Sequence, residues 1–168
     1  MSKIRPEKLV VDEKAIYALH RAAFPTDAEA RLVDRLRANG HSIISLVAEL
    51  DGKVVGHVLF SPVTAGLSQG LGLAPLAVLP SYRRQGIGSA LVWEGLTLCK
   101  GRTCEFVVVL GDPSYYFRFG FQPSSQFGMQ NEFGKGDSFM LRFICPEKLC
   151  ANNLARYGSE FAEWKVIY

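Results

Sequence analysis

The sequence has no long hydrophobic run. Every apolar stretch falls short of the roughly 18 residues that a membrane-spanning helix needs, so we expect no membrane partner. The first residues, MSKIRPE, also lack the apolar core of a signal peptide. The sequence therefore predicts a cytoplasmic protein.

Cysteine is scarce, and its spacing is wrong for a common metal site. The four cysteines form two pairs, Cys99 with Cys104 and Cys145 with Cys150, and four residues separate the members of each pair. Zinc knuckles use the tighter Cys-x-x-Cys spacing. Free thiols and no bound metal are therefore expected.

The chain also lacks an excess of charge of one sign. A formal net charge of +3 over 168 residues is small, so we expect no nucleic-acid partner. Hydrophobic residues make up 48% of the chain, which is enough to build a core without disulfides or metal. The length fits a single domain over residues 1–168.

Hydrophobic periodicity predicts a strand, two helices, three consecutive strands, a helix, a strand, a short helix and late strands, in that order. Asp12 and either Thr26 or Asp27 are expected helix caps, Asp51-Gly52 a hairpin turn, and Pro62 the end of a strand. The predicted strands are 3–10, 43–50, 53–60, 71–79, 106–110, 121–123 and 139–145, and the predicted helices are 12–23, 27–40, 86–100, a short one after Asp112-Pro113, and one within 160–165. This order predicts an α/β fold with one mixed sheet.

One segment points to a ligand. The apolar strand ends at Pro80, a short basic loop with Arg83 and Arg84 follows, and Gly86 and Gly88 open an amphipathic helix. The first N–H groups of a helix have no partner inside it, and the helix dipole adds positive charge there. The segment therefore predicts a site for a phosphate or pyrophosphate.

Two common phosphate-binding motifs do not fit this segment. A P-loop needs Gly-x-x-x-x-Gly-Lys-Ser/Thr, which the chain does not contain. A dinucleotide fingerprint needs a third glycine where Leu91 stands, and an acidic residue after the next strand, whereas Glu105 precedes that strand. An enzyme that uses NAD or ATP is therefore a weaker interpretation.

Two motifs resemble those of the GNAT superfamily of N-acetyltransferases. Arg83-x-x-Gly86-x-Gly88 is similar to the acyl-CoA loop of that family, and Tyr115–Phe121, with Tyr116 four residues before Gly120, is similar to its aromatic element. The start, Ile4–Glu7, resembles the first strand of the family. Residues 72–91 and 111–121 further resemble the YhbS-like branch. The resemblance covers residues 2–146, which leaves 147–168 as a C-terminal tail.

The resemblance implies a GNAT-like acyl-CoA N-acyltransferase fold. Its mixed, mostly antiparallel sheet would splay between the fourth and fifth strands, at 71–79 and 105–110, and helices would flank it. The implied activity is transfer of the acetyl group of acetyl-CoA directly to a primary amine, with no metal and no covalent enzyme intermediate.

The resemblance also implies which residues hold acetyl-CoA. The backbone of the strand before the loop would pair with the pantetheine arm, and the N–H of Val78 would polarise the thioester. Backbone N–H groups of the loop would surround the pyrophosphate, with the two arginine side chains as further contacts. The implied cofactor-binding residues are Leu76, Ala77, Val78, Arg83, Arg84, Gln85, Gly86, Ile87, Gly88 and Ser89.

Tyr116 is the candidate general acid. A phenol with a pKa near 10 is protonated at neutral pH and can donate to a departing thiolate. Its surroundings are rich in aromatic residues, so a core role for Tyr116 stays open, and Tyr115 is a second candidate. For the general base, Glu49, His57, Glu105 and a water relay all stay open. Asp112 is expected to cap a helix.

The acceptor amine is not identified by the sequence. The resemblance places acceptor walls at residues 24–35 and 127–138, which suits either a small-molecule amine or a protein amine. A homodimer through the late strands stays open, with no specific residue to support it. The competing hypothesis is a non-catalytic domain that binds or senses acyl-CoA, and turnover with any amine separates the two.

Overall fold

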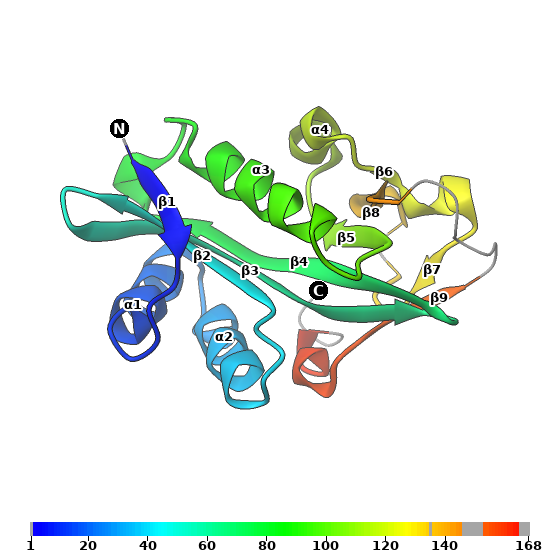
Figure 1. Ribbon diagram of the computed structural model, residues 1–168, viewed down its shortest axis with the longest axis horizontal. Helices are drawn as coiled ribbons and strands as arrows, with labels where there is room; N and C mark the ends of the chain where they lie inside the picture. The colour runs from blue at the N-terminus through cyan, green and yellow to red at the C-terminus, as the bar shows by residue number, and fades with distance from the viewer. Residues whose placement is uncertain (1, 135, 146–152, 165–168) are drawn as a thin grey trace. The chain divides into compact units, whose positions relative to one another are not determined.

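The computed structural model describes residues 2–134, 136–145 and 153–164 (Figure 1). The chain forms two compact units, one of Met1–Phe60 and Ala74–Thr97, the other of Ser61–Leu73 and Leu98–Tyr168. We call them unit 1 and unit 2. Two long strands, β3 (Lys53–Ala65) and β4 (Ser68–Val78), contribute to both units. None of the helices in the described ranges is long and apolar enough to span a membrane.

Unit 1 also contains the strands β1 and β2, three α-helices and a 3-10 helix at Pro80–Tyr82. Its α-helices and strands besides the parts of β3 and β4 are β1 (Lys3–Pro6), α1 (Glu13–Ala23), α2 (Ala28–Ala38), β2 (Ile44–Leu50) and most of α3 (Ile87–Lys100). The predicted helices and strands of this part are confirmed, with small shifts at their ends. The first strand is shorter than predicted, because the chain turns after Pro6 and the N–H of Asp12 donates to the carbonyl of Lys8.

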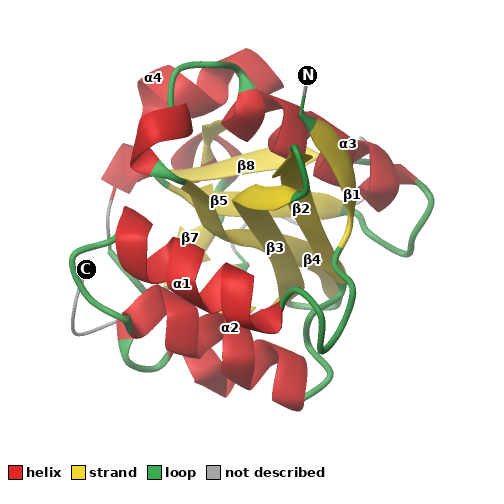
Figure 2. Cartoon of the chain, turned by 90° about the vertical axis from the view of Figure 1, so that its left-hand side faces the viewer, coloured by secondary structure: helices red, strands yellow, loops and turns green. Residues whose placement is uncertain are grey.

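The helices of unit 1 cover both faces of its strands. A Cβ at Gly56 of β3 would lie 3.0 Å from Ile87 and 3.0 Å from Leu91 of α3. The next residue, His57, points to the opposite face, as alternate residues of a strand do, and there it contacts His20 of α1. Within unit 1, α3 therefore lies on one face and α1 on the other, with α2 beside α1 (Figure 1 and Figure 2).

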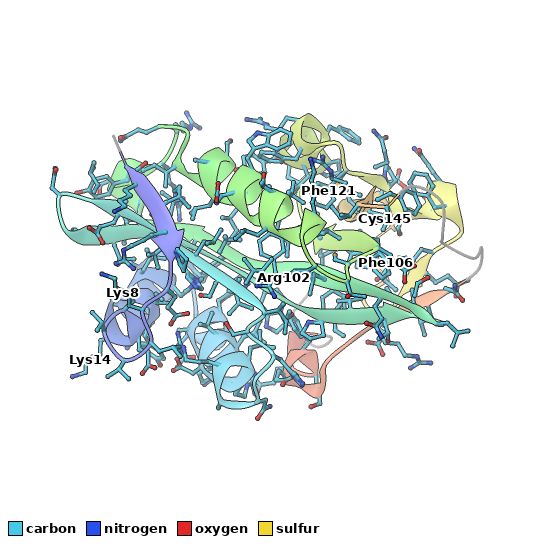
Figure 3. All side chains as sticks on the ribbon, in the orientation of Figure 1. Lys8, Lys14, Arg102, Phe106, Phe121 and Cys145 are labelled. Carbon is cyan, nitrogen blue, oxygen red and sulfur yellow. The ribbon has the colours of Figure 1, made fainter. Side chains whose placement is uncertain are left out.

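Unit 2 contains the later strands and short helical turns. Its strands besides the parts of β3 and β4 are β5 (Phe106–Leu110), β6 (Gln122–Pro123), β7 (Gln130–Asn131), β8 (Phe139–Phe143) and β9 (Leu154–Tyr157), and its α-helix α4 is Pro113–Tyr116. Phe106, labelled in Figure 3, is fully buried in the core of this unit. A Cβ at Gly70 would lie 2.4 Å from its ring, so glycine is required where β4 faces Phe106.

Hydrogen bonds connect the described strands in the order β1-β2-β3-β4-β5-β8-β6, with β9 also pairing with β3 and with β7. β4 and β5 are parallel, whereas β1–β2, β2–β3 and β5–β8 are antiparallel. The β4–β5 ladder ends at Gly72–Val108, although β4 continues to Val78 and β5 to Leu110. The predicted fold class, a mixed and mostly antiparallel sheet flanked by helices, is confirmed.

Some predicted boundaries were wrong. Pro62 does not end β3, which continues to Ala65. The strand pairs with β2 up to Phe60 and with β9 from Val63 onward, so Pro62 falls where the ladder changes partner and a missing N–H costs little. Of the helix predicted within 160–165, the described residues contain a 3-10 turn at Ser159–Phe161 and a helical residue at Trp164, and Lys165 lies outside the described residues.

The side chains predicted to cap helices bond the first turn of α4 and of α2, but not that of α1. The Asp112 carboxylate accepts a hydrogen bond from the N–H of Ser114 at 2.9 Å and therefore caps α4. Of the two alternatives for α2, Thr26 accepts a hydrogen bond through Oγ1 from the N–H of Ala28 at 3.3 Å, whereas the Asp27 side chain makes no cap bond. Asp12 precedes α1, but its side chain does not cap that helix. The Asp12 carboxylate instead pairs with Arg5, because a guanidinium is within reach and forms the stronger, charge-assisted bonds.

Candidate functional site

The predicted phosphate loop connects the end of β4 to the start of α3. Arg84 and Gly86 adopt left-handed backbone conformations, with φ of 59° and 81°. The first helical bond of α3 runs from the N–H of Ala90 to the carbonyl of Gly86 at 2.9 Å. Ile87, Gly88 and Ser89 precede this first bond, so their N–H groups have no partner within the helix. These N–H groups remain available to an anion.

The Arg83 side chain holds the loop in place. Its Nε donates to the carbonyl of Val78 at 3.2 Å, and its NH2 group donates to the carbonyl of Ala23 at 3.0 Å. These bonds tie the loop to the end of β4 and to the end of α1. Arg83 therefore organises the loop, whereas Arg84 is exposed and has a left-handed backbone.

In the strand before the loop, burial alternates from one residue to the next. Ala77 is buried, and Leu76 and Val78 are half-buried. All the residues predicted to bind the cofactor lie in unit 1, and the bond between Arg83 and the Val78 carbonyl brings the strand and the loop together.

Tyr116 lies in unit 2, at the end of α4. Asp112 and Pro113 start this short helix, and the N–H of Tyr116 donates to the carbonyl of Asp112 at 3.1 Å. A Cβ at Gly111 would lie 2.4 Å from the Tyr116 ring, so the ring packs directly against the glycine backbone. Gly120, with φ of 81°, ends the turn that follows.

Aromatic rings surround Tyr116. The ring centroids of Tyr115, Phe121 and Phe119 lie 5.0, 5.7 and 6.2 Å from its own. Tyr116 is 8% exposed, and burial raises the pKa of its phenol. The group is therefore protonated throughout the neutral range, as a general acid must be before it donates. Packing alone also explains the ring, so the catalytic role of Tyr116 stays a proposal.

Two of the candidate bases are already engaged. Glu49 accepts a hydrogen bond from Arg5 Nε at 2.7 Å. Glu105, at the start of β5, accepts one from the N–H of Gln69 at 3.3 Å. Both carboxylates therefore have structural partners, in unit 1 and unit 2 respectively.

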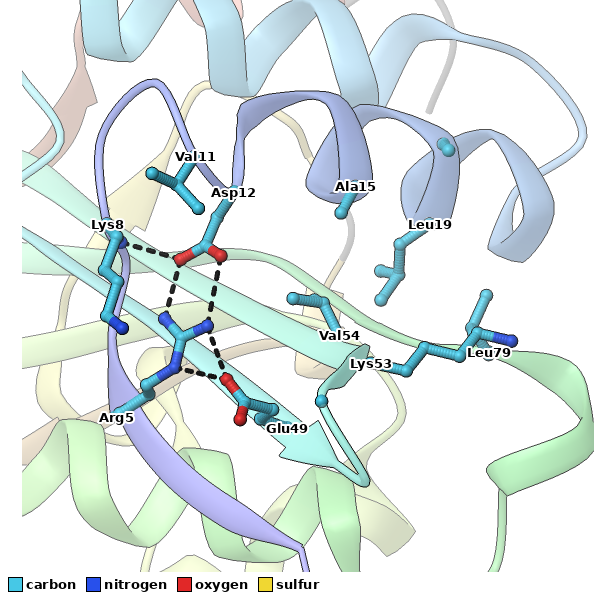
Figure 4. A pocket seen from close by; sticks show the side chains of 12 residues that line it. Arg5, Lys8, Val11, Asp12, Ala15, Leu19, Glu49, Lys53, Val54 and Leu79 are labelled. Carbon is cyan, nitrogen blue, oxygen red and sulfur yellow. Dashed lines mark hydrogen bonds and ion pairs between the residues drawn. The ribbon is translucent and has the colours of Figure 1, made fainter.

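A pocket of about 640 Å³ opens between α1 and the β2–β3 hairpin in unit 1 (Figure 4). At its floor, Arg5 donates to both oxygens of Asp12, at 2.6 and 3.1 Å, and pairs with Glu49. The hydrogen bonds from Arg5 lower the pKa of Asp12. These charges satisfy one another, and the pocket is lined by Leu79, which follows Val78, but by none of the predicted cofactor residues.

His57, the third candidate base, belongs to a buried chain of polar side chains in unit 1. His57 Nδ1 lies 2.8 Å from His20 Nε2, and His57 Nε2 lies 2.9 Å from Ser45 Oγ. Ser45 Oγ donates to Glu7 at 2.5 Å, and Arg37 donates twice to the other oxygen of Glu7, at 2.6 and 3.0 Å. We call Glu7, Ser45, His57 and His20 the polar chain.

The ion pair between Glu7 and Arg37 sets the direction of every bond in the polar chain. An ionised carboxylate can only accept, so Ser45 donates to Glu7 and must itself accept from His57 Nε2–H. His57 Nδ1 is then an acceptor, which His20 fills with its own Nε2–H. Both rings are therefore neutral Nε2–H tautomers, and a lone pair is left on His20 Nδ1.

His20 Nδ1 is buried and has no hydrogen-bond partner among the described residues. A buried polar atom left unpaired costs roughly 1–3 kcal/mol. The position is therefore one where a water molecule or a ligand group is expected.

Burial keeps both histidines neutral. It lowers the pKa of His20 to about 3, with a smaller contribution from the charge of Arg37. It also lowers the pKa of His57 well below its ordinary value, with smaller contributions from His20 and Arg37. Neither ring is therefore positively charged at neutral pH.

Stability is expected to fall as the pH drops below about 6.5, where histidines of the unfolded chain begin to take up protons that the two buried rings do not. The unfolded chain then binds more protons, which costs about 2 kcal/mol for each ring by pH 5. Urea unfolding at pH 7.5, 6 and 5 measures this loss. The variant His20→Leu removes one titrating ring, so its free energy of unfolding should fall less between pH 7.5 and pH 5 than that of the wild type. An equal fall in both proteins would contradict a neutral, buried His20.

No cluster of three or more potential metal ligands occurs among the residues that the structure describes. Cys99 and Cys104 are buried free thiols, and Cys104 Sγ donates to the carbonyl of Phe106 at 3.2 Å. Cys150 lies outside the described residues.

The sequence did not predict the polar chain as a unit. Its four members come from α1, β2, β3 and the turn after β1, and they are widely separated in sequence. Of the four, only His57 was a candidate base, because histidine titrates near neutrality. The partners carry no spacing signal, because antiparallel pairing and helix packing bring them together.

Comparisons with known proteins agree with the motifs. The model of the Acetyltransferase (GNAT) family matches residues 13–121, a range that includes the phosphate loop and Tyr116. The uncharacterized N-acetyltransferase YhbS of Escherichia coli K12 is 46% identical over 118 residues, which cover 68% of this chain and 71% of YhbS.

Two solved structures share the fold over nearly the whole chain. The crystal structure of E. coli YhbS in complex with CoA has a TM-score of 0.89 and 37% identity, and the match covers 96% of this chain and 92% of that one. A GNAT family acetyltransferase from Brucella melitensis in complex with acetyl-CoA has a TM-score of 0.79 and 33% identity, with coverage of 96% and 98%. CoA or acetyl-CoA is thus bound by proteins similar to this one.

Proposed function

Because the chain belongs to the GNAT acetyltransferase family, we propose that it transfers the acetyl group of acetyl-CoA directly to a primary amine, without a covalent enzyme intermediate. The observation that carries this proposal is the exposed loop at the start of α3. There, the left-handed backbone at Arg84 and Gly86 leads into a helix whose first N–H groups are available to an anion. The complexes of similar proteins with CoA and acetyl-CoA support the choice of ligand.

Within this proposal, each part of unit 1 has a distinct role. The N–H groups of Arg84 through Ser89 hold the pyrophosphate, and Arg84 adds a full positive charge. Arg83 keeps the loop against the end of β4 through the Val78 carbonyl. The backbone of Leu76–Val78 pairs with the pantetheine arm as an added strand would, and the N–H of Val78 polarises the thioester carbonyl.

Tyr116 of unit 2 is the proposed general acid. Its buried phenol holds its proton at neutral pH and can give it to the thiolate that leaves when the amide bond forms. Asp112 caps the start of α4, the short helix whose last residue is Tyr116, and so helps to hold Tyr116 in place. Asp112 itself has a cap role and no chemical one.

We also propose that the chain acts as a single domain in the cytoplasm, with residues 2–146 as the acetyltransferase core and 147–168 as a C-terminal segment whose strand β9 pairs with β3 and β7. The proposed partners are acetyl-CoA and a small-molecule or protein amine, with no bound metal. No step of this proposal requires a second copy of the chain.

An amine screen tests the proposed function. The protein is incubated with acetyl-CoA and a panel of primary amines that contains polyamines, amino acids, lysine peptides and peptides with free N-termini, and released CoA thiol is measured. We expect thiol release that depends on both protein and amine. Binding of acetyl-CoA without acetylation of any amine would contradict catalysis and favour an acyl-CoA-binding module.

A further inference from the structure

We propose that the polar chain Glu7–Ser45–His57–His20 is a proton relay that removes the proton of the acceptor amine during acetyl transfer. This inference rests on the proposed function. It starts from the directed hydrogen bonds inside unit 1, which lead from a buried, unpaired lone pair on His20 Nδ1 to the Glu7 carboxylate. In a purely structural network, the terminal atom, His20 Nδ1, would be expected to have a hydrogen-bond partner as well.

The relay avoids a buried positive charge. A lone histidine at this depth would be a poor base, because burial strongly disfavours the charged ring. In the polar chain, each ring instead accepts a proton at Nδ1 while it passes on the proton at Nε2. Neither His20 nor His57 has to remain charged, and the proton ends on a carboxylate.

Arg37 prepares Glu7 to receive the proton. Its two hydrogen bonds hold one oxygen of the Glu7 carboxylate, and the other oxygen accepts from the hydroxyl of Ser45. Arg37 also pairs with Asp34 at 2.7 Å, and Asp34 is half exposed. When Glu7 is protonated, Arg37 therefore keeps one carboxylate partner.

The His20 end of the relay contacts a segment predicted to form the acceptor site. The ring of Phe24 stacks on the ring of His20, with centroids 5.9 Å apart, and Phe24 begins the predicted acceptor wall at residues 24–35. The preceding residue, Ala23, accepts the hydrogen bond from Arg83 of the phosphate loop. Because His20 is fully buried, we place one water molecule between its Nδ1 and the amine.

The proposed step balances as follows. The amine nitrogen forms a bond to the acetyl carbon, the C–S bond breaks, and the thiolate takes a proton from Tyr116. The proton lost by the amine passes through the water to His20 Nδ1. The Nε2 proton of His20 moves to His57, the Nε2 proton of His57 moves to Ser45, and the hydroxyl proton of Ser45 moves to Glu7.

Ser45 gives the sharpest test, because a hydroxyl can be removed or kept there. Ser45→Ala breaks the relay, whereas Ser45→Thr keeps the hydroxyl and suits a β-strand. With an amine that the wild type acetylates, we expect Ser45→Ala to lower kcat about 10- to 100-fold. The KM for acetyl-CoA should stay within about twofold, and Ser45→Thr should restore kcat to about a third of the wild-type value or more.

The pH profile separates a relay from a structural role. In Ser45→Ala the amine must lose its proton to solvent, so kcat should rise about tenfold per pH unit up to the pKa of the amine itself. The wild type and Ser45→Thr should level off at lower pH. The groups that act on the rings are Glu7, Arg37 and, through Arg37, Asp34. Wild-type kcat and an unchanged profile in Ser45→Ala would overturn the relay.

Nitrogen-15 NMR of the histidine rings tests the direction of the polar chain without any acceptor. At pH 7, we expect His20 and His57 to be neutral Nε2–H tautomers in the wild type and in Ser45→Thr. A ring protonated at Nδ1 would overturn the relay even in an active enzyme. Failure of the proposed function is recognised separately, because the wild type itself would then bind acetyl-CoA and acetylate no amine of the panel.

Discussion

Replacing Gly86 with valine is expected to weaken acetyl-CoA binding at least about tenfold. Gly86 has φ of 81°, a conformation that costs a residue with a side chain roughly 1–2 kcal/mol and a β-branched one more. A Cβ at this position would meet nothing within 4 Å, so the substitution acts through the backbone rather than through a clash. When the backbone relaxes, the N–H groups at the start of α3 turn away from the phosphate. Isothermal titration calorimetry measures the dissociation constant.

Gly40 provides a matched control for this substitution. It follows α2, has φ of 72°, and also has nothing within 4 Å of a Cβ. Gly40→Val should therefore lower the melting temperature about as much as Gly86→Val does and leave acetyl-CoA affinity unchanged. Wild-type affinity in Gly86→Val would exclude the loop as the pyrophosphate site.

Tyr116→Phe is expected to lower kcat about 100-fold with little change in acetyl-CoA affinity. The variant removes only the hydroxyl, so the ring keeps its contacts with Gly111 and with the neighbouring aromatic rings. Without the phenol, the departing thiolate must take its proton from water. General-acid catalysis typically contributes a rate factor of about 10²–10⁴. Steady-state kinetics with an accepted amine and direct titration of acetyl-CoA separate the two effects.

Tyr115→Phe is the control for the acid. Tyr115 is the next residue, its ring lies 5.0 Å from that of Tyr116, and Arg118 stacks over it at 4.8 Å. We expect near-wild-type turnover from this variant. A larger loss in Tyr115→Phe than in Tyr116→Phe would assign the acid to Tyr115, and two unaffected variants would remove tyrosine from the mechanism.

The parts of the fold that the sequence predicted well are those governed by local chemistry. Asp51-Gly52 forms the turn between β2 and β3, because both residues adopt the positive φ that this hairpin needs. Asp112 and Pro113 start α4 through a side-chain cap and a fixed φ. The phosphate loop belongs to this class, since its strand, turn and helix are consecutive in sequence.

The features that the sequence could not predict depend on residues brought together by tertiary structure. Pro62 normally ends a strand, yet β3 continues because its pairing partner changes there from β2 to β9. The two hydrogen bonds that the Arg83 guanidinium donates to the carbonyls of Val78 and Ala23 also lie outside any local pattern. The polar chain from Glu7 to His20 likewise depends on the register of β2 against β3 and on how α1 packs against them.

Thermal unfolding with and without acetyl-CoA tests the central claim most directly, namely that the loop from Arg83 to Ser89 binds an acyl-CoA. At about 100 times its dissociation constant, a ligand adds roughly 2.7 kcal/mol to stability and raises the midpoint by several degrees. We predict such a shift with acetyl-CoA, none with NAD or ATP, and loss of the shift in Gly86→Val but not in Gly40→Val. No shift with acetyl-CoA, or an equal shift with NAD, would contradict the account.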